Sequence, residues 1–356
     1  MTLYFGYCDI VISTDKKTNK QISIFADTKR INSGKDGYMT ERNKMWFNGI
    51  MGVVVGDALG LPVQFKCREE LEKNPLKDMI GYGTFHMPEG SWSDDSSLTL
   101  AALASIRECN GIDLEDIMKR FAEWLIEGEY TPFGYAYDQG ATCIRAITNY
   151  VKSHDVESCG VTGERANGNG ALMRIMPVCL WAYEKEQAGE WTVEKAIEQI
   201  HKVASLTHNH LRSHIACGIY YFMVKNILNH AGNLQERLQT GMNEAAEFYR
   251  NDIRNLVQWE HYQRMSDMKV FQTVPVERIK SSGYVVDSLE AAVWCLLNTD
   301  TFEDCLLKAS NLGYDTDTVA AIAGGLAGLF YGGEKIPQGW LDKLQKKEWV
   351  KGLIEL

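Results

Sequence analysis

Two clusters of hydroxyl and carboxylate side chains, more than two hundred positions apart, contain the residue types that could do chemistry. The first is Ser93-Asp94-Asp95 and the second is Asp315-Thr316-Asp317-Thr318, and each precedes an Ala-rich apolar run. Their side chains offer only oxygen, which Mg²⁺, Mn²⁺ and Ca²⁺ prefer, whereas Zn²⁺ prefers His and Cys. If the clusters converge, they predict a hard-metal site and hence a metal-dependent hydrolase.

Each cluster also has an ordinary interpretation as the start of a helix. Ser and Asp are favoured N-caps because their oxygens accept the free N–H groups of the first turn. Capping needs one acceptor, yet these two starts carry four carboxylates, those of Asp94, Asp95, Asp315 and Asp317. Adjacent carboxylates about 4 Å apart repel by about 4 kcal/mol at an effective dielectric of about 20. Each helix dipole offers only about half a positive charge, so one or two divalent cations would complement facing clusters.

Two other segments carry weaker signals. The segment Gly56-Asp57-Ala58-Leu59-Gly60 sets one acid among small residues and predicts close helix packing around a buried carboxylate, either behind the metals or purely structural. The glycines of Asn167-Gly168-Asn169-Gly170 precede a helix and would let backbone N–H groups approach phosphate, although an ordinary turn has the same composition. Four clustered histidines lack the Glu of the zinc-protease pattern, which predicts that most are core or surface residues: His201, His208, His210 and His214.

Composition limits the possible classes of protein. The chain has 356 residues, of which 45% are hydrophobic and 24% charged, as in ordinary globular proteins. The net charge of −10 disfavours binding to nucleic acid or to anionic membranes. Nine scattered cysteines without a C-x-x-C pair, no basic apolar leader, and no apolar run near about 20 residues predict a reduced, cytoplasmic protein. The oligomeric state is left open.

The chain divides into a short extension and one large domain. Residues 1–45 contain two β-like runs joined by a polar segment, which predicts a β-hairpin, and the stretch through Lys44 has a net charge of +3 from eight Lys/Arg and five Asp/Glu. This extension is either a loosely attached leader or a partner-binding arm. Residues 46–356 show apolar residues three and four apart, as in 114–125, and predict a single all-α domain.

Taken together and in order, the motifs resemble those of the ADP-ribosylglycohydrolase family. The resemblance runs from about Trp46 to Gln338 and rests on Gly56–Gly60, Trp92–Asp95, Gly168–Arg174 and Asp315–Ala320. It implies an orthogonal multi-helix bundle with a binuclear Mg²⁺ site, for which Mn²⁺ is an alternative. It also implies a hydrolase that removes ADP-ribose from a modified side chain of a protein or small conjugate, with arginine favoured.

The resemblance also implies roles for individual residues. Asp94 or Asp95 would take the proton of the attacking water. The metal ligands would be Ser93, Asp94, Asp95, Asp315, Asp317 and Thr318. The substrate would contact Asp57, Gln64, Gly168, Asn169, Gly170, His208 and Tyr314.

Two positions depart from the family pattern. Gln64 stands where many members have Glu, and Gln cannot act as a carboxylate base; Tyr314 stands where many members have Gly. These departures motivate an alternative, a catalytically impaired ADP-ribose-binding protein. The basic extension motivates another, an immunity or interaction module. Without the resemblance, the acidic clusters alone would also suit a two-metal phosphohydrolase.

Overall fold

The computed structural model describes residues 40–229 and 231–355, and in these residues the chain is helical with no β-strand. The predicted all-α fold is therefore confirmed, while the predicted hairpin lies outside the described residues. The first helix begins at Glu41, after the N-cap Thr40, whose hydroxyl accepts a hydrogen bond from the N–H of Asn43. The boundary predicted at residue 45 thus falls inside a helix. The described residues form one compact unit.

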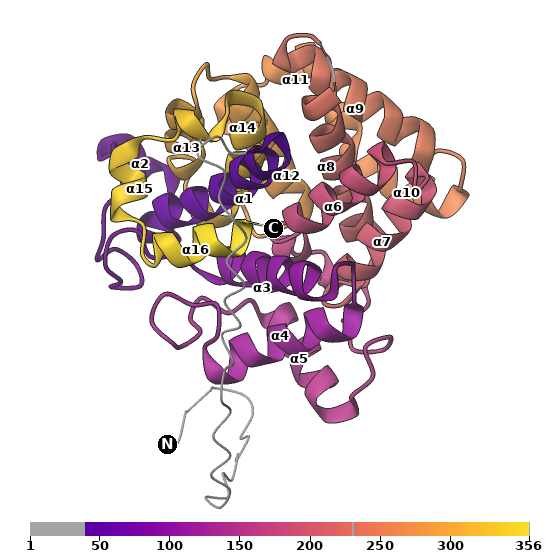
Figure 1. The fold of residues 1–356 in the computed structure, drawn as a ribbon. Coiled ribbons are helices and arrows are strands. Elements are labelled where there is room, and N and C mark those ends of the chain that lie inside the picture. The colour runs from indigo at the N-terminus through magenta and orange to yellow at the C-terminus, as the bar shows by residue number, and fades with distance from the viewer. Residues whose placement is uncertain (1–39, 230, 356) are drawn as a thin grey trace, which may run out of the picture. The chain divides into compact units, whose positions relative to one another are not determined.

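Sixteen α-helices and six short 3-10 helices make up the described chain (Figure 1). The α-helices are α1 (Glu41–Gly60), α2 (Arg68–Lys73), α3 (Asp94–Cys109), α4 (Leu114–Glu127), α5 (Ala141–Ser153), α6 (Met176–Gln187), α7 (Val193–Ser205), α8 (Leu211–Asn229), α9 (Leu234–Tyr249), α10 (Ile253–Trp259), α11 (Met268–Gln272), α12 (Val285–Leu297), α13 (Phe302–Ser310), α14 (Thr316–Tyr331), α15 (Gln338–Lys343) and α16 (Lys347–Ile354). The 3-10 helices are η1 (Leu61–Val63), η2 (Glu164–Ala166), η3 (Asn169–Ala171), η4 (Glu260–Met265), η5 (Val276–Arg278) and η6 (Gly333–Lys335).

Helices α1 and α14 pack against each other at the centre of the unit and run antiparallel (Figure 1). A Cβ atom on Gly56 would lie 2.1 Å from the carbonyl oxygen of Ala320, and one on Gly60 would lie 2.4 Å from that of Thr316. Only glycine permits this approach. The predicted close packing around Gly56–Gly60 is confirmed, and it sets the end of α1 against the start of α14.

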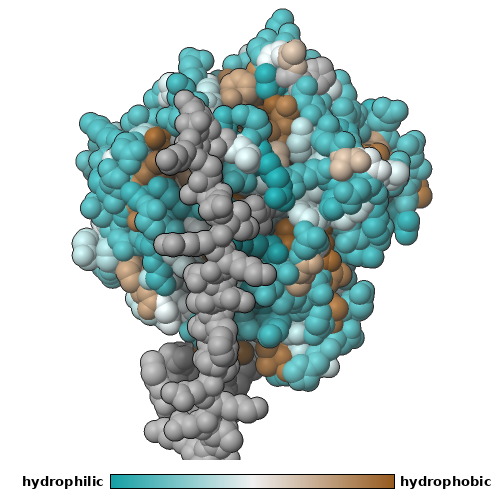
Figure 2. All heavy atoms as spheres, viewed as in Figure 1, coloured by the Kyte–Doolittle hydropathy of each residue, from teal (hydrophilic) through white to brown (hydrophobic). Residues whose placement is uncertain are grey.

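The remaining helices surround this pair. Helices α3, α4 and α5 follow one another along one side, and α6 to α10 form the group on another side (Figure 1). The exposed face in Figure 2 is mostly hydrophilic, with isolated hydrophobic residues among the described ones. Because both faces of the central pair are covered, its residues are apolar all round rather than on one stripe.

Helix α1 contradicts one expectation from the sequence. Together with η1, as Glu41–Val63, it is 23 residues long with a mean hydropathy of 1.4, and by length and composition it could span a membrane. However, 89% of the most apolar stretch is buried inside the protein. The high hydropathy of this segment is explained by its place at the centre of the core.

Candidate active site

The two acidic clusters meet at the end of the α1–α14 pair. Ser93 is the N-cap of α3 and Asp315 is the N-cap of α14, as expected for helix starts. The carboxylate oxygen Oδ2 of Asp95 lies 3.2 Å from the hydroxyl of Ser93 and 3.3 Å from that of Thr318. One carboxylate therefore accepts hydrogen bonds from both clusters, although they are separated by more than two hundred residues.

Asp57 holds the start of α3 in place. Both of its carboxylate oxygens lie 2.9 Å from the backbone nitrogen of Ser93, and Oδ2 also accepts from the N–H and the hydroxyl of Ser96, at 2.9 and 2.6 Å. Burial raises the pKa of Asp57 to about 6, although these hydrogen bonds oppose the shift. The fully buried carboxylate of Asp57 is occupied by α3 and acts as a positioning group, and its contact with substrate stays a prediction.

The other carboxylates of the cluster lack such partners. Neither oxygen of Asp317, nor Oδ1 of Asp95, accepts a hydrogen bond within the described residues. Burial, followed by the charges of Asp138 and Asp95, raises the pKa of Asp317 well above its ordinary value. Burial and then the charges of Asp138 and Asp57 do the same for the pKa of Asp94. The site thus gathers buried negative charge that the surrounding chain does not neutralise.

A further acid, Asp138, belongs to this cluster and was not among the predicted site residues. Burial raises its pKa, whereas its contacts with the carboxyl of Asp317 and the amide of Gln64 lower it. The charge of Asp138 and its contact with the carboxyl of Asp317 raise the pKa of Asp317, as expected for two neighbouring carboxyls whose titrations are linked. Asp138 has a left-handed φ of 50°, an unusual conformation that often marks functional sites. Its only sequence signal was the segment Asp138-Gln139-Gly140 ahead of α5.

Gln64 is placed at the acid cluster as predicted. It is buried, its amide lowers the pKa of Asp315 as well as that of Asp138, and its own oxygen Oε1 has no partner within the described chain. The side chain follows η1, directly after the end of α1. Because the amide of Gln64 is neutral, it does not add to the repulsion among the carboxylates, as a Glu at this position would.

The glycine segment reaches the same cluster from a different direction. The side-chain nitrogen Nδ2 of Asn169 donates to Asp315 Oδ2 at 2.5 Å and to the hydroxyl of Ser288 at 2.9 Å. The backbone N–H of Asn169 donates to the carbonyl of Gly283 at 3.0 Å, so this turn is fastened to the start of α12. The segment leads into η3 and not directly into a long helix, because α6 begins only at Met176.

His208 packs against the glycines of this turn. A Cβ on Gly170 would lie 2.7 Å from its ring carbon Cε1, and one on Gly168 would lie 3.3 Å from Nε2. On the other edge of the ring, Nδ1 lies 2.9 Å from the hydroxyl of Thr207, which accepts a hydrogen bond from the buried Arg174 at 2.8 Å. Burial, with the charge of Arg174, lowers the pKa of His208 to about 3, so the imidazole is neutral at physiological pH.

The other predicted histidines lie elsewhere. His201 and His214 stack with ring centroids 5.3 Å apart in the core, and burial lowers their pKa values to about 3 and about 4. Tyr314, in contrast, is at the edge of the acid cluster but is half exposed, with a left-handed φ of 64°. Its ring is not turned into the core.

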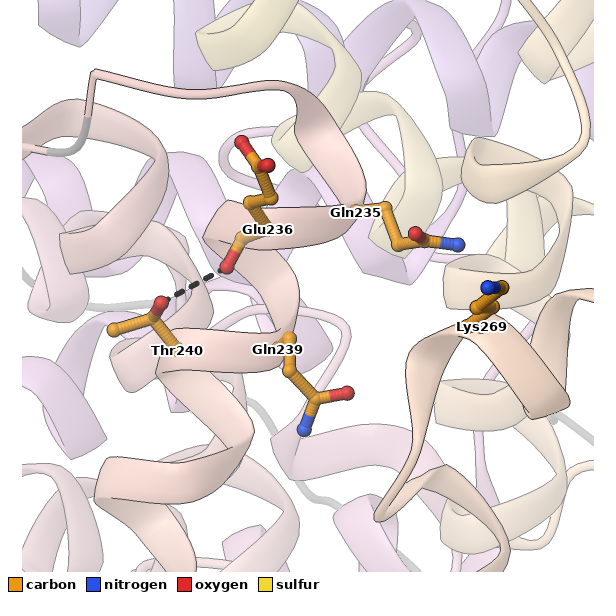
Figure 3. Close-up of a pocket in the computed structure, with 5 residues that line it drawn as sticks. All are labelled: Gln235, Glu236, Gln239, Thr240 and Lys269. Atoms are coloured by element: carbon orange, nitrogen blue, oxygen red, sulfur yellow. Dashed lines mark hydrogen bonds between the residues drawn. The ribbon is translucent and has the colours of Figure 1, made fainter.

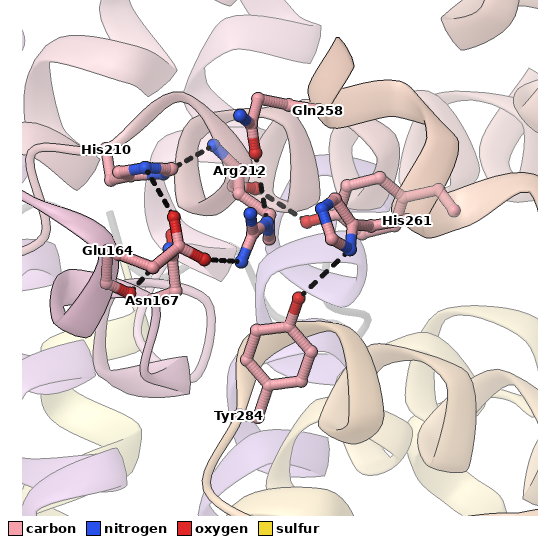
Figure 4. A network of polar contacts seen from close by, with 8 residues as sticks. Glu164, Asn167, His210, Arg212, Gln258, His261 and Tyr284 are labelled. Carbon is pink, nitrogen blue, oxygen red and sulfur yellow. Dashed lines mark hydrogen bonds and ion pairs between the residues drawn. The ribbon is translucent and has the colours of Figure 1, made fainter.

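A second polar cluster lies beyond the glycine turn (Figure 4). Arg212 donates to the carboxylate of Glu164 at 2.5 Å and to the amide oxygen of Gln258 at 3.0 Å, and His210 lies 3.6 Å from Glu164. The hydrogen bond from Arg212 lowers the pKa of Glu164. We call this cluster, which also includes Asn167, His261 and Tyr284, the paired network. Its charges, unlike those of the acid cluster, neutralise one another.

A separate hollow lies between α9 and α11 and contains none of the predicted site residues (Figure 3). Its lining consists of Gln235, Glu236, Gln239, Thr240 and Lys269.

Across the described residues, no three side chains of His, Cys, Asp and Glu are grouped as a metal-ligand set by themselves. A cation at the acid cluster would therefore have to draw on hydroxyls, water or substrate as well as carboxylates.

Two acidic helix starts and a glycine turn thus converge within an all-α scaffold. Residues 45–356 match the family model for ADP-ribosylglycohydrolases, and the chain belongs to this family. It is 31% identical over 300 residues to the ADP-ribosyl-[dinitrogen reductase] glycohydrolase of Rhodospirillum rubrum, covering 83% of this chain and 89% of that protein. It is 30% identical over 306 residues to the ADP-ribosylarginine hydrolase Tri1 of Serratia proteamaculans (strain 568), covering 86% of this chain and 76% of that protein.

A solved structure is similar over most of its length. An ADP-ribosylglycohydrolase-related protein complex aligns with a TM-score of 0.70 and 28% sequence identity, covering 89% of this chain and 97% of that one. The predicted fold type and family are thereby confirmed. The protein is an enzyme of the ADP-ribosylglycohydrolase class, which removes ADP-ribose by hydrolysis.

Proposed function

We propose that the protein is a Mg²⁺-dependent hydrolase that cleaves the glycosidic bond between ADP-ribose and an arginine side chain. The observation that carries the proposal is the buried acid cluster, in which Asp317 has two oxygens and Asp95 one without a hydrogen-bond donor in the described chain. Buried charge without a partner is costly, and a hard cation bound by oxygen ligands is the natural complement.

The donors present suit two such cations. Asp94, Asp95 and Ser93 would hold them from α3, and Asp315, Asp317 and Thr318 from α14. All six side chains offer oxygen, and five of them are nearly fully buried, with Asp315 in contact with Asn169. Mg²⁺ or Mn²⁺ bound there would act as a Lewis acid. It would orient the ribose hydroxyls and a water molecule and would lower the pKa of that water.

Residues of the chain itself would accept the proton of the attacking water, contact the diphosphate and ribose, and stabilise the charge that develops on the sugar. We assign the proton of the attacking water to Asp94, Asp95 or Asp138, since these carboxyls lie together within the cluster. The neutral His208 and the backbone of Gly168–Gly170 form a close-packed wall suited to the diphosphate and ribose. Negative charge beside the anomeric carbon stabilises the developing oxocarbenium ion.

Arginine is favoured as the modified side chain for two reasons. The guanidine group is basic enough to leave without a strong general acid, so the linkage tolerates the amide of Gln64. Two of the relatives also support this choice, since one is named as an ADP-ribosylarginine hydrolase and another acts on ADP-ribosylated dinitrogen reductase. A cytoplasmic ADP-ribosylated protein or small conjugate is the proposed partner.

Release of ADP-ribose from arginine-modified and serine-modified peptides, with Mg²⁺ or with EDTA, tests the proposal. We expect Mg²⁺-dependent release that is faster from the arginine peptide. Release that is unaffected by EDTA would contradict the metal assignment, and release only from the serine peptide would contradict the substrate. The formation of inorganic phosphate in place of ADP-ribose would instead indicate a phosphohydrolase.

A catalytically impaired ADP-ribose-binding protein is the second candidate, and the amide at Gln64 is the observation that favours it. Under this alternative, wild type binds ADP-ribose without turnover, and Gln64→Glu creates activity. Under our proposal wild type turns over, because Asp138 already supplies a carboxylate beside Gln64. Measuring kcat for both proteins on the arginine peptide separates the two.

A further inference from the structure

We propose that a rim of aromatic side chains beside the acid cluster binds the arginine-bearing segment of the modified polypeptide. The inference rests on the proposed function and deepens it, since it assigns the surface that receives the protein part of the substrate. We call these side chains the aromatic rim: Phe65, Phe85, Tyr135, Tyr137 and Tyr314.

Four rings of the rim form a continuous series. Phe65 and Phe85 have ring centroids 6.1 Å apart, Phe85 and Tyr137 are 6.0 Å apart, and Tyr137 and Tyr135 are 6.0 Å apart. All three pairs are tilted, with interplanar angles of 44° to 54°. Tilted contacts at these distances stabilise aromatic pairs, so the rings form a connected surface and not a set of independent side chains.

Three of these rings are exposed to solvent. The side chain of Phe65 is 64% exposed, that of Tyr135 51% and that of Tyr314 48%. Phe85 and Tyr137, which are partly exposed, join the exposed rings of Phe65 and Tyr135. Single exposed hydrophobic residues are common, but exposed rings joined at a site are typical of a binding surface.

The backbone is held in an unusual conformation to present two of them. Phe65 and Tyr314 have left-handed φ values of 66° and 64°, which are rare for bulky residues. Two backbone hydrogen bonds of 2.7 Å, from Phe65 N–H to the carbonyl of Tyr314 and from Tyr314 N–H to that of Lys66, hold them side by side. Conformations of this kind persist where the surrounding structure enforces them and cluster at ligand sites.

The rim is joined directly to the acids. Phe65 follows Gln64, Tyr137 precedes Asp138, and Tyr314 precedes Asp315. The loop with Phe85 is fastened to the same place, because the hydroxyl of Thr84 donates to the carbonyl of Gln64 at 2.6 Å. Burial, followed by the charge of Asp57, raises the pKa of Tyr137, and the charges of Asp138 and Asp94 contribute in the same direction.

This arrangement suits a cationic, partly apolar ligand. Aromatic faces attract guanidinium and ammonium groups, and the neighbouring carboxylates add negative potential. An arginine has an apolar stem and a planar cationic head, and so matches both features. The diphosphate of ADP-ribose has the opposite charge and has a separate place at the glycine turn, where the neutral His208 and the buried cation Arg174 lie.

The test uses the full chain, with ADP-ribosylated arginine in a peptide and as the free amino acid. Phe65→Ala and Tyr135→Ala should each raise the KM for the peptide and for ADP-ribosyl-arginine about tenfold, because both carry the arginine that loses a cation–π contact. Tyr314→Gly should weaken peptide binding likewise without lowering the Tm, because glycine adopts φ 64° freely. This variant separates loss of binding from loss of folding.

A binding measurement keeps the inference independent of catalysis. Fluorescence anisotropy in EDTA compares the affinity of each variant for the labelled ADP-ribosylated peptide and for ADP-ribose alone. We expect the rim variants to lose peptide affinity and to retain that for ADP-ribose, whether or not wild type shows turnover. Trp349→Ala, at an exposed aromatic residue on α16, is the control that should change neither. Unchanged peptide affinity in all rim variants, or a selective loss of ADP-ribose affinity, would overturn the assignment.

Discussion

The acid cluster and the paired network lie on either side of the glycine turn, and both contain buried or half-buried charged groups. In the paired network, Arg212 meets Glu164 at 2.5 Å, and the amide of Gln258 satisfies a second N–H of the same guanidinium (Figure 4). In the acid cluster, Asp317 has no donor in the described chain and faces Asp138. The first arrangement is complete as a protein structure, whereas the second is complete only with a ligand. Charge that the fold leaves unbalanced is thus the better guide to function.

The largest effect is expected for Asp317→Asn, which removes one unbalanced charge. We expect the rate of ADP-ribose release to fall by at least about a hundredfold through loss of a metal ligand. The metal-free protein should become more stable, since the variant removes a buried charge that lacks a partner. Peptide hydrolysis and thermal unfolding in EDTA measure the two effects. Asp300→Asn, at an exposed acid outside the site, is the matched control.

The second prediction concerns pH and metal. The pKa values of Asp94, Asp95 and Asp317 are raised in the folded protein, mainly by burial and then by neighbouring carboxylates. The folded metal-free protein therefore retains protons that the unfolded chain releases. Its free energy of unfolding should be highest below pH about 4 and fall as pH rises through the raised pKa values.

Divalent cations should reverse this trend. Mg²⁺ competes with protons for the same oxygens, so the increase in Tm caused by Mg²⁺ over EDTA should grow from pH 5 to pH 8 by roughly several degrees. Thermal scans across this range measure the difference. An increase that is equal at all pH values would show that these carboxyls do not bind the cation.

Asp57→Asn is expected to have an intermediate effect of opposite sign on stability. Unlike Asp317, Asp57 accepts from the N–H groups of Ser93 and Ser96 and from the hydroxyl of Ser96. Its replacement should destabilise the protein by about 1–3 kcal/mol, because buried donors at the start of α3 lose a charged acceptor. Urea unfolding of both variants provides the comparison. If Asp57→Asn and Asp317→Asn shifted stability in the same direction, the distinction between paired and unpaired acids would be wrong.

The smallest effects are expected in the paired network. Arg212→Met should lower the free energy of unfolding by about 1–2 kcal/mol, because Gln258 loses a hydrogen bond while the more exposed Glu164 remains solvated. Glu164→Gln should have less effect still, within about 1 kcal/mol. Neither variant should alter the stabilisation by Mg²⁺. A loss of that stabilisation in either one would place the metal site nearer to the glycine turn than proposed.

Much of this site was predictable from residue types and spacing. The oxygen-only donors of Ser93–Asp95 and Asp315–Thr318, and their place at helix starts, follow from the sequence because N-capping and carboxylate chemistry are local properties. Asp138 was not selected, since one acid ahead of a helix is a common pattern. Its importance comes from facing Asp317, a contact across 179 positions that no local pattern encodes.

The sequence by itself determined the helical fold, the acidic clusters and the small residues that permit close packing. Only the tertiary structure decided which acids are paired. Asp57 and Asp317 are both buried Asp residues within or beside α-helices, and nothing in their neighbouring residues distinguishes them. The antiparallel approach of α1 and α14 through Gly56 and Gly60 directs Asp57 to the N–H groups of α3 and leaves Asp317 facing other carboxylates. The physical reason is that hydrogen-bond satisfaction depends on the distances between helices, which side-chain packing over the whole domain fixes.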